Sequence, residues 1–156
     1  NKININKKNF QNKVDNKLDL LRNINHYFDF KLRNITDSID QSTRKDMIFE
    51  IIMMRFDILQ IHRKPIIKIF EFFKKKPQEL VFLLPSLIES MISMAGLAKI
   101  PVVGIKGNLK VKGLLVIYFS SFLVWAKDNS ESLEKTMTSL DNHLDRTGKL
   151  LSIIKI

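Results

Sequence analysis

The chain has 156 residues, of which 45% are hydrophobic and 27% charged, ordinary values for one soluble domain with a sizeable core. It has no cysteine, which excludes disulfides, thiolate metal ligands and cysteine nucleophiles. A net charge of +10 is typical of proteins that bind nucleic acid or anionic membranes. However, the lysines are scattered outside the triplet at 74–76, so a lysine-rich composition is the favoured explanation of the charge.

The first half of the chain shows the apolar periodicity of amphipathic helices. Apolar residues spaced three and four apart predict a helix over residues 12–33. Thr43 and Asp46 match a capping box, which predicts that the next helix, over residues 45–60, begins there. A polar stretch separates the two predicted helices.

Prolines and glycines divide the middle of the chain. Pro65 fits the first turn of a third helix, which is predicted to end near the lysine triplet. Pro77 begins a fourth predicted helix that extends to about residue 98 and is bent at Pro85. The stretch 96–107 has three glycines and a proline and is predicted to be a loop.

The last two predicted helices, over residues 104–126 and 130–152, differ in character. The first contains the run GLLVIYFSSFLVWA, in which only two serines are polar, and such a helix is expected to be buried on all sides. Asp128 or Ser130 is expected to cap the second. Apolar residues spaced 4, 3, 4 and 7 apart form a stripe along the second helix, a pattern typical of a helix that packs lengthwise against another helix. These residues are Leu133, Met137, Leu140, Leu144 and Leu151.

The apolar first helix of this pair predicts a homodimer. A chain of this length does not readily cover such a helix on two sides, so a second copy is expected to pack over the last two helices in a two-fold, four-helix arrangement. The residues expected at that interface are Leu123, Trp125, Leu133, Met137, Leu140 and Leu144.

Residues typical of catalysis are sparse. The histidines His26, His62 and His143 have no second ligand at metal spacing, and no glycine-rich phosphate loop is present. We therefore expect no enzyme activity, no bound metal and no cofactor. Glu89 lies in an apolar segment, and three interpretations of it are open: a buried general base, a polar anchor for a ligand, or a solvent-facing residue.

Aromatic and methionine side chains on separate predicted helices are candidates for the lining of one ligand cavity. Methionine adapts to irregular apolar shapes, and apolar pockets between helices are common ligand sites. The alternative is that the same side chains fill a core. The candidates are Phe49, Met53, Phe56, Met91, Met94, Phe119 and Phe122.

Two apolar stretches of the chain are candidates for a membrane span. Residues 80–98 include a proline and a glutamate, and residues 113–126 fall short of the roughly 20 residues that cross a bilayer. We expect both to be core helices, with no transmembrane segment, in a cytoplasmic protein.

Three segments resemble a known family. Residues 45–71, KDMIFEIIMMRFDILQIHRKPIIKIFE, resemble the C-terminal body of TetR-type regulators from alphaproteobacteria. Residues 10–21 resemble the junction where the DNA-binding head of these regulators passes into the body. Residues 110–144 are similar in the same way, with the family's spacing at Trp125, Asp128, Ser130, Thr136, Leu140, Asp141 and Leu144.

The resemblance covers residues 10–150 and implies a TetR C-terminal-like helical bundle. It implies that residues 12–156 form a ligand-binding and dimerisation domain and that residues 1–11 are the remnant of a junction to a missing helix-turn-helix head. The implied function is the effector-binding domain of a TetR-like transcriptional regulator that senses an apolar or amphipathic small molecule.

An alternative follows from the same pattern, which recurs in non-enzymatic lipid- or isoprenoid-binding accessory proteins of ubiquinone biosynthesis. Under both readings we expect no sequence-specific DNA binding by this chain alone, because groove-reading side chains would belong to the missing head.

Overall fold

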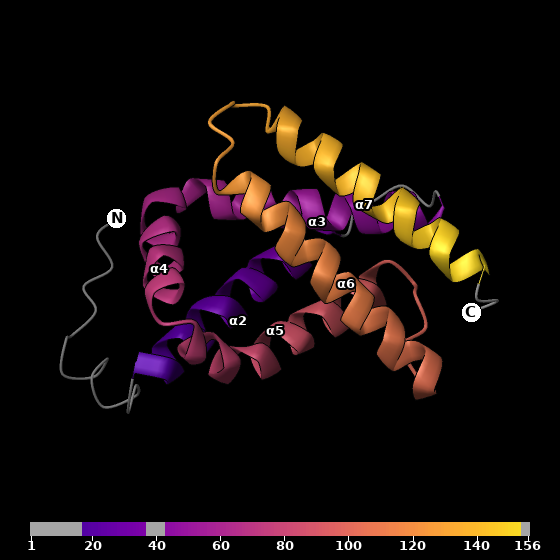
Figure 1. Ribbon diagram of the computed structural model, residues 1–156, viewed down its shortest axis with the longest axis horizontal. Helices are drawn as coiled ribbons and strands as arrows, with labels where there is room; N and C mark the ends of the chain where they lie inside the picture. The colour runs from indigo at the N-terminus through magenta and orange to yellow at the C-terminus, as the bar shows by residue number, and fades with distance from the viewer. Residues whose placement is uncertain (1–16, 37–42, 154–156) are drawn as a thin grey trace.

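The computed structural model describes residues 17–36 and 43–153, and every regular element in these ranges is a helix (Figure 1). The predicted all-α bundle of about six helices is therefore confirmed. The helices are α2 (Lys17–Ile35), α3 (Arg44–Ile61), α4 (Arg63–Lys75), α5 (Pro77–Leu97), α6 (Gly104–Trp125) and α7 (Glu134–Ile153).

Helix α3 is the centre of the bundle, because it contacts each of the other five helices. Its side chains Ile51, Ile52 and Phe56 are completely buried. Helices α2 and α5 pack on one another, as do α6 and α7, and α4 lies across one end of the bundle (Figure 1). The five helices around α3 therefore bury most of its apolar side chains, and its exposed side carries Asp46, Glu50 and Asp57.

The predicted starts of the second, third and fourth helices are confirmed to within two residues. The Asp46 N–H donates to Thr43 Oγ1 at 3.2 Å, so Thr43 caps α3. Pro77 is the first residue of α5, and Pro65 lies in the first turn of α4. Residues 12–16 of the first predicted helix lie outside the described residues.

Helix α7 begins at Glu134, four residues later than predicted, because Asp128 holds the preceding loop. Asp128 Oδ1 accepts from the Ser130 backbone N–H at 3.2 Å and the Ser130 hydroxyl at 2.6 Å. Its Oδ2 accepts from the backbone N–H and the hydroxyl of Thr136, both at 2.9 Å. Thr136 lies in the first turn of α7, where helical N–H groups lack partners within the helix. Of the two predicted caps, Asp128 is the one observed.

The hydrogen bonds also set the charge state of Asp128. Burial alone would raise the pKa of this carboxyl, which is only 1% exposed. The hydrogen bonds from Ser130 and Thr136 outweigh burial and hold the pKa well below its ordinary value. Asp128 is therefore a buried carboxylate that is stable only because its loop supplies donors.

The expectation that the helix over residues 104–126, which is α6, is buried on all sides is wrong for a single chain. Leu109, Val116 and Leu123 are 46%, 66% and 46% exposed. Because they are seven residues apart, they lie on one side of α6 and form what we call the α6 stripe. Only α3, α5 and α7 pack substantially against α6, which leaves this side uncovered.

Helices α5 and α6 are each long and apolar enough to cross a bilayer, judged by length and composition alone. Within the chain, 39% of the most apolar window of α5 and 33% of that of α6 is buried. Core helices of soluble proteins meet the same criterion, so the absence of a transmembrane segment stays a prediction.

Candidate ligand-binding cavity

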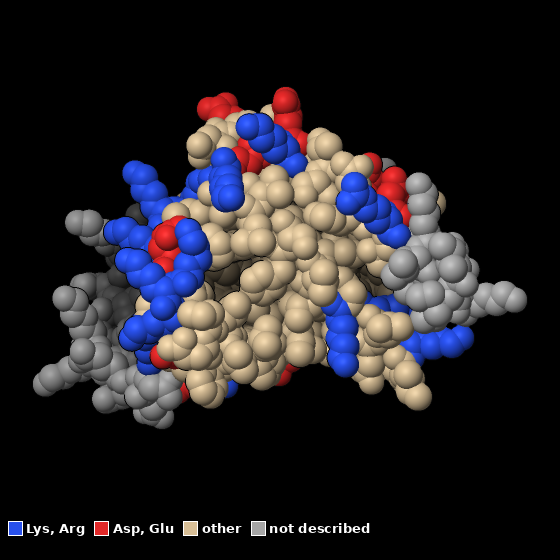
Figure 2. Space-filling model, viewed as in Figure 1, with Lys and Arg blue, Asp and Glu red and all other residues tan. Residues whose placement is uncertain are grey.

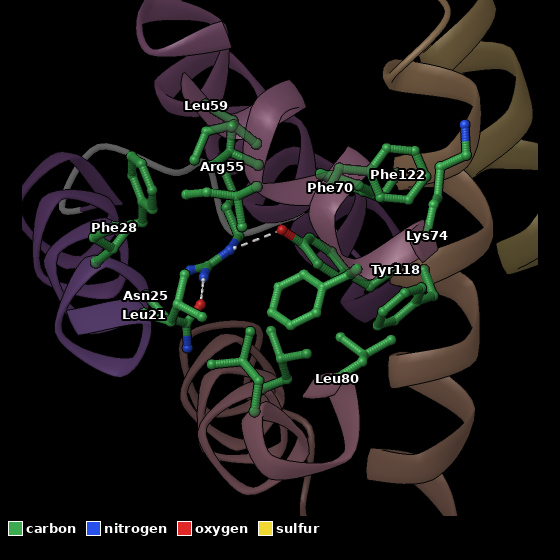
Figure 3. Close-up of a pocket in the computed structure, with 17 residues that line it drawn as sticks. Leu21, Asn25, Phe28, Arg55, Leu59, Phe70, Lys74, Leu80, Tyr118 and Phe122 are labelled. Atoms are coloured by element: carbon green, nitrogen blue, oxygen red, sulfur yellow. Dashed lines mark hydrogen bonds between the residues drawn. The ribbon is translucent and has the colours of Figure 1, made fainter. Parts of the chain in front are cut away.

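Five helices line a cavity of about 230 Å³ that is partly open to solvent (Figure 3). Thirteen of its 17 lining side chains are apolar, and only four are polar or charged. The lining residues are Leu21, Ile24, Asn25 and Phe28 of α2, Arg55 and Leu59 of α3, Ile66, Ile69, Phe70, Phe73 and Lys74 of α4, Leu80, Leu83 and Leu87 of α5, and Tyr118, Phe119 and Phe122 of α6.

Helix α4 closes one side of the cavity. Its residues Ile66, Ile69, Phe70 and Phe73 are spaced three and four apart, so they share one face of the helix, and that face lines the cavity. The rings of Phe70 and Phe122 meet edge to face at 5.3 Å and join α4 to α6. Two aromatic side chains from different helices thus form one wall.

Three of the four polar lining side chains, Asn25, Arg55 and Tyr118, converge at one end of the cavity. The Arg55 guanidinium donates to Asp29 Oδ1, to Asn25 Oδ1 at 2.8 Å and, through Nε, to the Tyr118 hydroxyl at 3.2 Å. These four residues, which we call the polar end, come from α2, α3 and α6. Figure 3 shows the bonds from Arg55 to Asn25 and Tyr118 beside the apolar lining.

Two serines of α5 complete the network. The Asn25 amide donates to the hydroxyls of Ser86 and Ser90, each at 2.8 Å, and Ser90 Oγ donates to Asp29 Oδ2 at 2.7 Å. Burial by itself would lower the pKa of Arg55, but its interactions with Tyr118 and Asp29 raise that pKa above the ordinary value. Arg55 therefore carries a buried positive charge that Asp29 balances.

Lys74 lies across the cavity from the polar end, as Figure 3 shows. Its ammonium is exposed and donates to Glu71 at 3.0 Å. The cavity therefore has two charge pairs. Arg55 and Asp29 form a buried pair at the polar end, and Lys74 and Glu71 form an exposed pair on α4.

Of the seven predicted cavity residues, Phe119 and Phe122 line the cavity. The other five do not, because they face the packed interior around α3. Phe56 is completely buried and stacks on Tyr118 with ring centroids 5.5 Å apart. Met91 and Met94 are also completely buried, and Phe49 and Met53 pack partly buried against the same core. This packing fits the filled-core alternative for Phe56, Met91 and Met94.

The predicted dimer residues separate into two groups. Leu123 and Met137 are 46% and 42% exposed. The others, Trp125, Leu133, Leu140 and Leu144, are buried within one chain, where α7 packs on α6 and α3. The apolar stripe of α7 therefore finds its neighbours in its own chain; the side chain of Leu151 lies outside the described residues.

Glu89 lies outside the cavity. Its side chain is 66% exposed, and its carboxylate lies 4.0 Å from His26 Nε2. Of the three interpretations of Glu89, the structure therefore shows the solvent-facing one.

No protein-family model matches this chain, and no curated protein matches it.

Proposed function

We propose that this chain is the effector-binding and dimerisation domain of a TetR-like transcriptional regulator that senses an apolar or amphipathic small molecule. DNA binding would be carried by a helix-turn-helix head before residue 12. The domain itself binds no cofactor and catalyses no reaction under this proposal.

The cavity is the observation that carries the proposal. Ligand sites are typically concave and apolar, with a few fixed polar groups that orient the ligand, and this cavity has both features. An apolar cavity of roughly 150 Å³ has room for benzene, so about 230 Å³ has room for a ligand of about nine non-hydrogen atoms. A core without a ligand role would be expected to fill such a space.

The contacts of α4 give a route from the cavity to the rest of the domain. Arg63, at the start of α4, donates to the backbone oxygens of Trp125 at 3.0 Å and Ala126 at 3.2 Å. Its guanidinium also lies 4.8 Å from the Trp125 ring centroid. A ligand that displaces α4 would therefore shift the end of α6, and such a shift between two states is how an effector changes a distant site.

The proposed homodimer uses the α6 stripe. Figure 2 shows a broad area of uncharged side chains on the face where α6 lies in Figure 1, with lysines and arginines gathered toward α4. Exposed apolar faces of this kind are typical of protein interfaces. Leu123 and Met137 of the predicted interface are exposed and available for such a contact, and Leu109 and Val116 join them.

Binding of isopropylbenzene to the purified chain tests the proposal. Trp125 is the only tryptophan, and its ring lies 5.3 Å from that of the cavity residue Phe122. Its indole N–H signal in a ¹H–¹⁵N NMR spectrum therefore reports on the cavity. We expect the signal to shift saturably with isopropylbenzene.

Two substitutions locate the binding. Leu80→Phe places a larger side chain in the cavity and should abolish the shift, whereas Val116→Phe on the outer side of α6 should leave it unchanged, and neither variant adds a second indole signal. No saturable binding to the parent, or equal binding to the Leu80→Phe variant, would refute the ligand-binding function.

The lipid-binding accessory protein remains the second candidate because of the start of α6. Val103 and Ile105 are 90% and 89% exposed; Lys106 follows Ile105 directly, and Lys99 lies four residues before Val103. Exposed apolar side chains flanked by lysines suit an anionic membrane surface. A helix-turn-helix encoded upstream of Asn1 supports the regulator, whereas lipid that co-purifies with a headless protein supports the accessory role.

A further inference from the structure

At the polar end of the cavity, some N–H and O–H groups have no hydrogen-bond acceptor among the described residues. A guanidinium has five N–H groups, and three of those of Arg55 have acceptors among the described residues. Tyr118 accepts from Arg55, and no described residue accepts from its own hydroxyl hydrogen. Because Tyr118 is only 6% exposed and lines the cavity, that hydrogen is directed to the cavity or left without a partner.

The net charge of the polar end is zero. Arg55 and Asp29 are 1% and 4% exposed, and their charges pair directly. A carboxylate or phosphate ligand would add a negative charge that nothing in the buried end balances, and burial of an unpaired charge is strongly unfavourable. The exposed Lys74 does not change this, because it lies across the cavity and already donates to Glu71.

We infer that the ligand is an uncharged apolar molecule that carries one hydrogen-bond acceptor, such as a ketone or ester carbonyl, and that this oxygen accepts from the Tyr118 hydroxyl. The inference rests on the proposed ligand-binding function and adds the chemical class of the ligand. Tyr118 is the donor that distinguishes a carbonyl compound from a hydrocarbon of the same shape.

Three probes of matched shape and equal numbers of non-hydrogen atoms test the inference: acetophenone, isopropylbenzene and benzoate. One hydrogen bond of ordinary strength, about 1 kcal/mol, corresponds to roughly a fivefold difference in affinity. We expect acetophenone to bind about fivefold more tightly than isopropylbenzene, and benzoate to bind at least about tenfold more weakly than isopropylbenzene. The titrations use the Trp125 indole signal and the complete chain.

The variant Tyr118→Phe removes only the hydroxyl. It should reduce acetophenone affinity to about that of isopropylbenzene while leaving isopropylbenzene affinity unchanged, which also shows that the cavity is intact. Tyr27→Phe is the matched control, because Tyr27 is the only other tyrosine, is 44% exposed and does not line the cavity. It should leave the affinities for all three probes unchanged.

The infrared carbonyl band of bound acetophenone gives a second readout that does not depend on affinity. A hydrogen bond from Tyr118 lowers the stretching frequency, so the band of the parent complex should lie below that of the Tyr118→Phe complex. Equal bands in the two complexes, or benzoate binding as tightly as acetophenone, would overturn the inference while leaving the cavity a ligand site. Failure of all three probes to bind would overturn the proposed function as well.

Discussion

The contribution of Asp128 to stability depends on its negative charge. Asp128 accepts four hydrogen bonds while almost completely buried, and bonds to charged groups are worth about 1.5–3 kcal/mol each, though not additively. We predict that Asp128→Ala lowers the free energy of unfolding by about 3 kcal/mol at pH 7. Urea denaturation gives this value, and Glu131→Ala, an exposed change in the same loop, should alter it by less than about 0.5 kcal/mol.

The lowered pKa of Asp128 determines whether its contribution to the free energy of unfolding rises or falls with pH. Its folded pKa lies below the unfolded value of about 3.9, so the unfolded state binds the proton more readily. The stabilisation is therefore complete above about pH 5 and is lost as pH falls toward the folded pKa. The difference in unfolding free energy between the parent and Asp128→Ala should shrink between pH 5 and about pH 2. An unchanged difference across that range would contradict the assignment.

The role of Asp128 as a helix cap could be predicted from the sequence, whereas the role of Arg55 in the polar end could not. A carboxylate before a helix has a local role that the sequence shows, because caps depend on neighbouring residues. Arg55 lies in an apolar run, and its partners Asn25 and Tyr118 are 30 and 63 residues away. Contacts at that separation arise only from the packing of α2, α3 and α6, so the polar end was not predictable residue by residue.

At the scale of elements, the glycines of α6 have opposite roles. A Cβ built on Gly107 would overlap the backbone of Val102, whereas one on Gly113 would meet nothing within 4 Å. We predict that Gly107→Ala lowers the free energy of unfolding by about 2 kcal/mol, because backbone must move to admit the methyl group. Gly113→Ala should raise it by about 0.5–1 kcal/mol, because alanine restricts the unfolded chain and favours helix.

Urea denaturation of the two alanine variants compares them directly. Since both change the same residue type within one helix, helix propensity cancels in the comparison. A Gly107→Ala protein as stable as Gly113→Ala would mean that the segment before α6 does not pack against Gly107.

Helix starts were predicted correctly from the sequence where a capping residue or a proline lies directly at the start. The starts of α3 and α5 were predicted from Thr43 and Pro77, since these signals act within one helical turn. The start of α7 was predicted too early, because the Asp128 cap acts across a loop rather than within one helical turn. That loop ends at Leu133, which adopts a positive φ of 51° and is only 1% exposed. Periodicity alone placed this buried leucine inside the helix.

At the scale of the whole molecule, the same ambiguity affected the dimer prediction. A stripe of leucines on α7 has the same spacing whether it packs on its own chain or on a second copy. In the structure, Leu140 is completely buried within one chain and the α6 stripe is exposed. The proposed interface therefore moves from the α7 leucines to the outer side of α6, with Leu123 and Met137 retained.

The last prediction tests that interface. Val116 is 66% exposed at the centre of the α6 stripe, so Val116→Asp should leave the fold intact but place a charge in a two-fold contact. We expect it to weaken dimerisation by roughly 30-fold or more, which corresponds to the 2 kcal/mol or more that an unpaired interfacial charge costs. Sedimentation velocity of the parent and the variant measures the change.

Two controls separate interface from fold. Val81→Asp introduces the same charge at a 60% exposed position on α5 and should leave the protein dimeric. Leu140→Asp should unfold the chain, which circular dichroism detects, because it places a charge in the core. A parent that sediments as a monomer at all concentrations, or a Val116→Asp variant that remains dimeric, would rule out the α6 stripe as the dimer contact. The α6 stripe would then remain exposed in the isolated domain, and its cover would have to be sought in a different partner.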